Sequence, residues 1–159
     1  SVSQMGVVAA VLGLGLAAGD ARSGMAAAFY AAHHVLVKGA LFLAVGVAAA
    51  GARGRRAWVL APAMLLCLGL GGLPFTGGAI AKFAVKDAFG TGLTAALSAA
   101  SAAGTTLLML HFLRRLAVAE VDGDGRAPAG LILPWLVMAA AALLLPWMLY
   151  TPAGLGAPR

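Results

Sequence analysis

Long stretches without a charged side chain constrain the fold of this chain more than any other feature. Four stretches of 19 residues or more contain no Asp, Glu, Lys or Arg: Ser1–Gly19, Ala57–Ala81, Ala88–Leu113 and Ala127–Pro158. A helix of about 20 apolar residues can cross the hydrocarbon core of a bilayer, which is about 30 Å thick. Two shorter stretches flank Lys38 and join into a fifth span if the membrane tolerates that lysine. We therefore expect an all-α membrane protein with about five transmembrane helices.

Composition excludes the other broad classes of protein. Hydrophobic residues make up 62% of the chain and charged residues 10%, and the mean hydropathy is +0.98. A soluble domain has about 45–50% apolar and about 25% charged residues, and a disordered chain is less hydrophobic still. The parts outside the spans are too short for a soluble domain, so residues 1–159 are expected to form a single transmembrane domain. The net charge of +6 lies in short loops between apolar runs, which is typical of membrane-flanking charge and not of nucleic-acid binding.

The chain carries no motif for a cofactor, a disulfide framework or a metal cluster. Its single cysteine, Cys67, lies within an apolar run. His33, His34 and His111 do not have the spacing of a metal-ligand set. The first residues include neither an initiating Met nor a basic leader, so they do not indicate a signal peptide. We expect the chain to be a fragment of a longer protein or one half of a split subunit.

Two glycine-rich breaks predict one discontinuous crossing. Residues 71–78 contain four glycines and Pro74, and no regular helix continues through them. The apolar stretch 79–89 that follows would reach only about 16 Å as a helix. We expect it to share a crossing with residues 93–116, beyond the second break at 90–92. The basic clusters 53–56 and 114–115 then face the same side, which the positive-inside rule places in the cytoplasm together with the N-terminus.

Two lysines within the apolar regions are the main candidates for function. Lys38 lies near the middle of the second span, where a charged side chain costs about 2.5–3.5 kcal/mol on insertion scales. Tyr30, His34 and Lys38 are spaced four apart and would lie on one helix face as a proton relay. Lys82 lies between the two breaks, and interrupted membrane helices often build ion sites.

The remaining candidates are auxiliary. His33 points about 100° away from His34 on a helix, and a helix contact is as good an explanation for it as a role. Lys86 and Asp87 follow Lys82 by one turn, and Asp87 is a candidate counter-charge for a lysine. His111 lies near the end of the span 93–116. The candidate helix break itself contains Pro74, Gly77 and Gly78.

Three motifs occur in an order that resembles a known family. They are the stretches 1–6 (SVSQMG), 32–43 (AHHVLVKGALFL) and 72–83 (GLPFTGGAIAKF). Together they resemble the antiporter-like membrane subunits of respiratory complex I, a family that includes Mrp-type antiporters and the membrane arms of energy-converting hydrogenases. The motifs cover residues 1–83, and the remainder is similar only in hydropathy and in a glycine- and threonine-containing helix that ends in basic residues.

The resemblance implies a fold and a set of relay residues. It implies one inverted five-helix repeat, the second of two, without the first half-channel. The family's His-x-x-x-Lys corresponds to His34 and Lys38, and the lysine of its discontinuous helix corresponds to Lys82. Tyr30 stands where some members have another histidine.

The resemblance also implies a function, with alternatives left open. We expect proton translocation across a prokaryotic inner membrane through a Lys/His relay, together with partner membrane subunits that supply the missing half-channel. Any cofactor, catalytic centre or electron donor would belong to partner subunits of an NADH:quinone oxidoreductase-type or hydrogenase-type complex. One alternative is an Mrp-type sodium/proton antiporter subunit. The other is a non-conducting structural or assembly piece.

Overall fold

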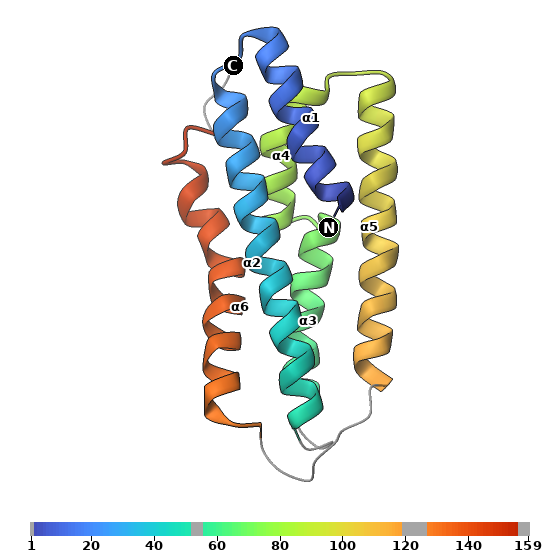
Figure 1. Cartoon of the computed structure of the whole chain (residues 1–159), viewed down its shortest axis with the longest axis vertical. Helices are drawn as coiled ribbons and strands as arrows, with labels where there is room; N and C mark the ends of the chain where they lie inside the picture. Colours follow the sequence, from blue (N-terminus) through green and yellow to red (C-terminus); the bar gives the residue numbers. More distant parts are fainter. Residues whose placement is uncertain (1, 52–55, 119–126, 156–159) are drawn as a thin grey trace.

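The computed structural model describes residues 2–51, 56–118 and 127–155, except for the side chains of Val2, Arg56 and Asp87. All regular secondary structure in these residues is helical. Six helices follow one another along the chain: α1 (Val2–Ala18), α2 (Arg22–Ala50), α3 (Arg56–Gly71), α4 (Gly77–Phe89), α5 (Leu93–Val118) and α6 (Ala129–Tyr150) (Figure 1). The predicted all-α fold is confirmed at this level, and the expected segments 79–89 and 93–116 agree with α4 and α5 within two residues at each end.

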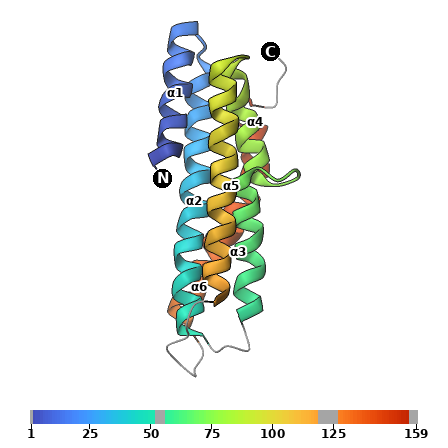
Figure 2. The ribbon, with the colours of Figure 1, turned by 90° about the vertical axis from the view of Figure 1, so that its right-hand side faces the viewer.

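Three of the helices are long and apolar enough to cross a membrane, namely α2, α5 and α6. Helices α1 and α3 are apolar but shorter, with 17 and 16 residues. The helices run roughly parallel to the long axis of the molecule, as the two side views show (Figures 1 and 2). This arrangement is compatible with a membrane protein.

The discontinuous element differs from the one that the sequence predicted. Figure 1 shows α3 and α4 end to end, rising along the bundle in one direction, whereas α5 runs back the opposite way. The chain therefore keeps its direction after the break at residues 72–76, whereas it reverses its direction at the break at 90–92. Gly90 and Gly92 have φ values of +55° and +103°, which suit glycine and allow this tight reversal. Helix α4 thus continues α3, and the expected pairing of residues 79–89 with 93–116 was wrong.

Helix α2 is the centre of the bundle and packs against α1, α3, α4 and α6. Small residues on α2, including Ala40 and Ala44, are completely buried and let the neighbouring helices approach closely. One apolar cluster joins α2 to α3, α5 and α6, and a second joins α1, α2 and α4.

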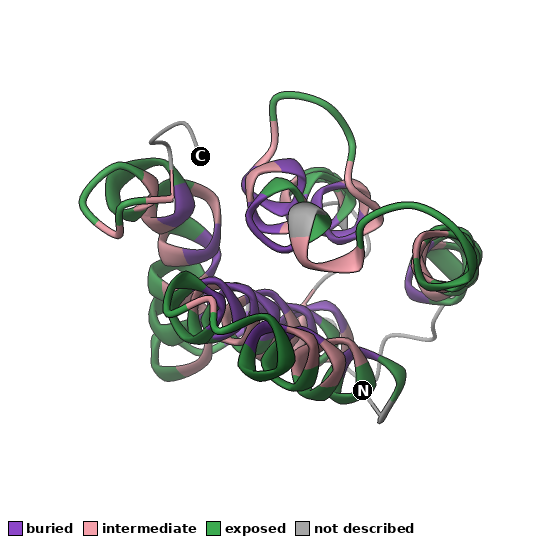
Figure 3. Ribbon diagram, turned by 90° about the horizontal axis from the view of Figure 1, so that it is seen from above, coloured by how far each residue is buried: buried purple, intermediate pink, exposed green. Residues whose placement is uncertain are grey.

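Helix α5 is much less enclosed. Only Met109 and Leu116 of α5 are buried, and the helix packs chiefly against α3. Viewed along the bundle, α5 is the mostly exposed helix at the right (Figure 3). It closes one side of the space in which the candidate residues lie.

Candidate functional site

Lys82 lies at the break between α3 and α4 and interacts with the end of α3. The last carbonyl groups of a helix have no partner within the helix and carry a partial negative charge. The Nζ atom of Lys82 donates a hydrogen bond to the carbonyl oxygen of Gly71, the last residue of α3, at 2.5 Å. On the other side of the break, the Thr76 hydroxyl accepts a hydrogen bond from the N–H of Ala79 and caps the start of α4. Lys82 therefore joins α4 to the end of α3, whereas Thr76 caps α4 and also donates from its hydroxyl to the carbonyl oxygen of Leu73 within the break, at 2.6 Å.

Two glycines are required for this geometry. Gly72 has a φ of +93°, and a Cβ atom there would lie 2.8 Å from Cδ and 2.9 Å from Nζ of Lys82. Gly78 is packed so closely against Gly69 that an added Cβ would overlap the Gly69 carbonyl group. Glycine at 72 leaves room for the lysine, and glycine at 78 lets the two half-helices touch backbone to backbone.

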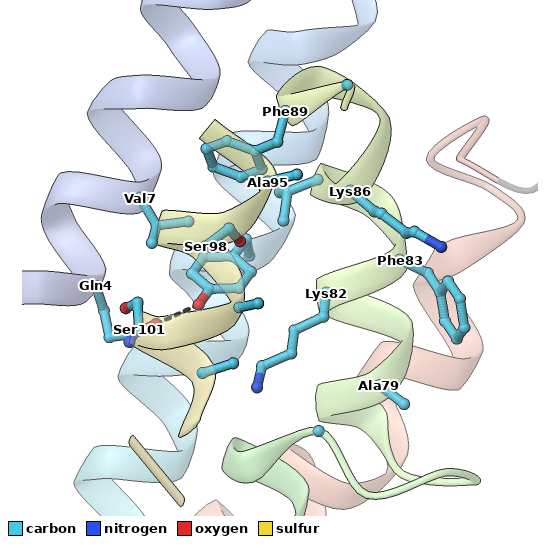
Figure 4. Close-up of a pocket in the computed structure, with 16 residues that line it drawn as sticks. Gln4, Val7, Ala79, Lys82, Phe83, Lys86, Phe89, Ala95, Ser98 and Ser101 are labelled. Atoms are coloured by element: carbon cyan, nitrogen blue, oxygen red, sulfur yellow. Dashed lines mark hydrogen bonds between the residues drawn. The ribbon is translucent and has the colours of Figure 1, made fainter. Parts of the chain in front are cut away.

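A cavity of about 320 Å³ surrounds the Lys82 side chain (Figure 4). It lies between α1, α2, α4 and α5. Its polar lining includes Gln4, Tyr30, Ser98 and Ser101 in addition to the lysine. Figure 4 shows the Lys82 side chain extending into the space bordered by these groups. Because several polar groups converge there, the cavity can hold water molecules.

A second cavity of about 290 Å³ surrounds Lys38. Its polar lining comprises Ser3, Gln4, His34, Ser101 and Thr105 besides the lysine. His34 is only 4% exposed, and its Nε2 atom has no hydrogen-bond partner among the described residues. The expected association of His34 with Lys38 on one helix face is present, and both residues border the same space.

The two cavities meet at Gln4 and Ser101, which line both of them. The Tyr30 hydroxyl donates a hydrogen bond to Oε1 of Gln4. Nε2 of Gln4 in turn donates to Oγ1 of Thr105 at 2.9 Å. Ser3 and Ser101 share a hydrogen bond of 3.0 Å between their hydroxyl groups. A band of hydrogen-bonded polar side chains from α1, α2 and α5 thus lies where the Lys82 and Lys38 cavities adjoin.

His33 lies elsewhere. It is 6% exposed and points toward the start of α4, where its Cε1 atom would lie 3.4 Å from a Cβ at Gly77. Both of its ring nitrogens are buried without a hydrogen-bond partner in the described part of the chain. His33 borders neither cavity, so its neighbour His34 is the histidine that the structure brings to a lysine.

The other auxiliary candidates are peripheral. Lys86 also lines the Lys82 cavity, but it is exposed, its amine points away from that of Lys82 (Figure 4), and its Nζ atom lies 5.9 Å from the centre of the Phe83 ring. His111 is exposed on α5 and borders neither cavity. The side chain of Asp87, the candidate counter-charge, lies outside the described side chains, as do all side chains of the basic cluster 53–56. Pro74 is exposed in the break. Within the described residues, no three His, Cys, Asp or Glu side chains are grouped to hold a metal ion.

The sequence interpretation missed the polar groups that join the two cavities. Gln4 was part of a motif but was not a candidate residue, although it is only 7% exposed. Ser98, Ser101 and Thr105 are spaced three and four apart in the span 93–116, so they share a helix face. That spacing was a usable signal for a polar stripe directed at the lysines.

No protein-family model, curated protein or solved structure matches the chain. The site is therefore interpreted from its own geometry.

Proposed function

We propose that this chain conducts protons across a membrane as an antiporter-like subunit of a larger complex. The observation that carries the proposal is the pair of neighbouring cavities, one lined by Lys82 and the other by Lys38, that share Gln4 and Ser101 in their linings. A lysine amine and a histidine ring both exchange protons with water, and intramembrane ionisable residues commonly mark ion pathways. The three motifs at residues 1–6, 32–43 and 72–83 add the family resemblance described above.

The proposed membrane arrangement has four full crossings, made by α2, by α3 and α4 together, by α5 and by α6, whereas α1 runs along only the upper part of the bundle (Figures 1 and 2). The end of α2, the start of α3 and the end of α5, which carries Arg114 and Arg115, lie at the same end of the bundle (Figure 1). The positive-inside rule then assigns this end to the cytoplasm of a prokaryotic cell. The family resemblance of the three motifs is what supports the proposal that these helices form one repeat of an antiporter-like subunit.

In the proposed mechanism, Lys82 and Lys38 are protonated and deprotonated in turn. The carbonyl of Gly71 stabilises a protonated Lys82, because it accepts a hydrogen bond from Nζ at the negative end of α3. A positive charge on one lysine disfavours protonation of the other, since like charges repel. His34 borders the Lys38 cavity and can pass a proton to or from that amine through water. Partner subunits would supply the driving reaction and the other half-channel.

Protons fit the cavities better than sodium ions do. Hard cations prefer several oxygen ligands, usually with carboxylates among them. No Asp or Glu is among the described side chains that line the two cavities, and each cavity contains a lysine. A sodium/proton antiporter remains the alternative, and exchange driven by a sodium gradient without an electron donor would select it.

The test is proton flux in proteoliposomes that contain the chain in its assembled complex. Lys82→Ala and Lys38→Ala are each expected to abolish driven flux while the complex still assembles. Lys86→Ala is the matched control, because the Lys86 amine is exposed and one turn from Lys82, and it is expected to retain most of the flux. Normal flux in both of the first two variants would refute the relay, and an assembled complex that never conducts would favour the structural alternative.

A further inference from the structure

Gln4 is not one of the proposed relay residues, yet it lies between the two lysines of the relay. It lies in the first turn of α1, is 7% exposed, and reaches between α2 and α5 at the wall between the two cavities (Figure 4). Its oxygen accepts from Tyr30 on α2, and its nitrogen donates to Thr105 on α5. One side chain therefore connects three helices at the point where Lys82 and Lys38 would have to communicate.

The chemistry of the amide makes this connection a poor conductor of protons. Hydroxyl groups and water can each accept one proton and release another, whereas a carboxamide nitrogen does not release a proton near neutral pH. The hydrogen bonds also run in one direction: from Tyr30 to Gln4, from Gln4 to Thr105, and from Thr105 to the carbonyl oxygen of Ser101 at 2.9 Å. A backbone carbonyl has no proton to pass on. The chain of bonds thus ends without reaching Lys38.

We propose that Gln4 is the gate between the two lysine cavities. With its amide bonded to Tyr30 and Thr105, the cavities are separate and proton exchange between them is blocked. When the Gln4 side chain swings aside, water can join the cavities and a proton can cross from one amine to the other. This inference rests on the proposed function and adds to it the element that keeps a path with two wet cavities from leaking.

The gate is tested by passive proton leak, measured in proteoliposomes of the assembled complex under an imposed pH difference without any driving reaction. Gln4→Ala removes both hydrogen bonds and the side-chain volume, and it is expected to raise the leak roughly tenfold or more. Tyr30→Phe removes one bond and preserves the ring, so a smaller increase is expected. Gln4→Leu fills the space without polar groups and is expected to hold the leak at the wild-type rate and to abolish driven flux.

A double variant connects the leak to the cavities. Adding Lys82→Ala to Gln4→Ala is expected to lower the leak again if protons cross by way of the Lys82 amine. Tyr30→Phe is nearly isosteric, so it remains informative if Gln4→Ala fails to assemble. A wild-type leak rate in both Gln4→Ala and Tyr30→Phe, or full driven flux in Gln4→Leu, would overturn the gate. Because the leak requires no driving reaction, its outcome is separate from the loss of pumping in Lys82→Ala, which tests the proposed function.

Discussion

Replacing Gly72 by alanine tests how Lys82 is held at the helix break. The new Cβ atom would lie 2.8 Å from Cδ and 2.9 Å from Nζ of Lys82, which is too close for atoms that are not bonded. The end of a lysine side chain is flexible, so we expect the lysine to move and not the backbone. Its hydrogen bond to the Gly71 carbonyl would then be lost.

The expected cost has two parts. Alanine at the φ of +93° found at Gly72 costs about 1–2 kcal/mol, because L-residues disfavour this region. Loss of a hydrogen bond from a charged donor costs about 1.5–3 kcal/mol. Together they predict that Gly72→Ala lowers the free energy of unfolding by about 2.5–5 kcal/mol.

A double-mutant cycle separates the two parts. The free energy of unfolding is measured in mixed micelles by titration with SDS, for Gly72→Ala with Lys82 present and in the Lys82→Ala background. In that background only the backbone cost remains, so Gly72→Ala should cost about 1–2 kcal/mol. The difference between the two backgrounds is the part that acts through Lys82. An equal cost in both backgrounds would refute the assignment of Lys82 to the end of α3.

Three further substitutions probe the surroundings of the site. Gly78→Ala places a Cβ atom against the Gly69 carbonyl group, and the backbone cannot move aside as a lysine side chain can. We therefore expect a loss of stability whether or not Lys82 is present. The same SDS titration checks this, and a mild effect would contradict the close contact of α3 and α4. His33→Leu removes two ring nitrogens that are buried without partners, so stability should be unchanged or rise by up to about 3 kcal/mol with pumping retained; a large loss of pumping would show that His33 belongs to the relay. His111→Ala changes an exposed side chain that borders neither cavity, and proton flux is expected to stay near the wild-type rate, in contrast to His34→Ala.

Much of the fold could be predicted from where charges and glycines fall along the chain. A charge-free run of sufficient length predicts a helix, and glycine clusters at 71–78 and 90–92 predict where helices end. The sequence could not tell which break reverses the chain, because either pairing leaves the basic clusters on the same side of the membrane. The difference lies in tertiary contacts: the Lys82 hydrogen bond to Gly71 and the close approach of Gly78 to Gly69 hold α4 against the end of α3, whereas Gly90 and Gly92 turn the chain back.

The candidate site was predictable only where its residues share one helix. His34 and Lys38 are four residues apart, so helical periodicity places them together. Gln4, by contrast, contacts Tyr30, which is 26 positions away in the chain, and Thr105, which is 101 positions away. No local pattern encodes such contacts, since they depend on how α1, α2 and α5 pack.

The most direct measurement of the central idea is whether water reaches both lysine cavities in the membrane. Single cysteines are introduced in a Cys67→Ala background: Ser98→Cys in the Lys82 cavity and Gly104→Cys in the Lys38 cavity. Position 104 has room for a side chain, because a Cβ atom added to Gly104 meets no atom within 4 Å. Leu97→Cys is the control, because Leu97 is 61% exposed on the same helix and borders neither cavity. A water-soluble thiol reagent reacts with the thiolate, which forms only where water is present. The expected result is rapid labelling at 98 and 104 and little at 97; no labelling at 98 and 104, with the protein folded in the bilayer, would contradict a wet path between the two amines.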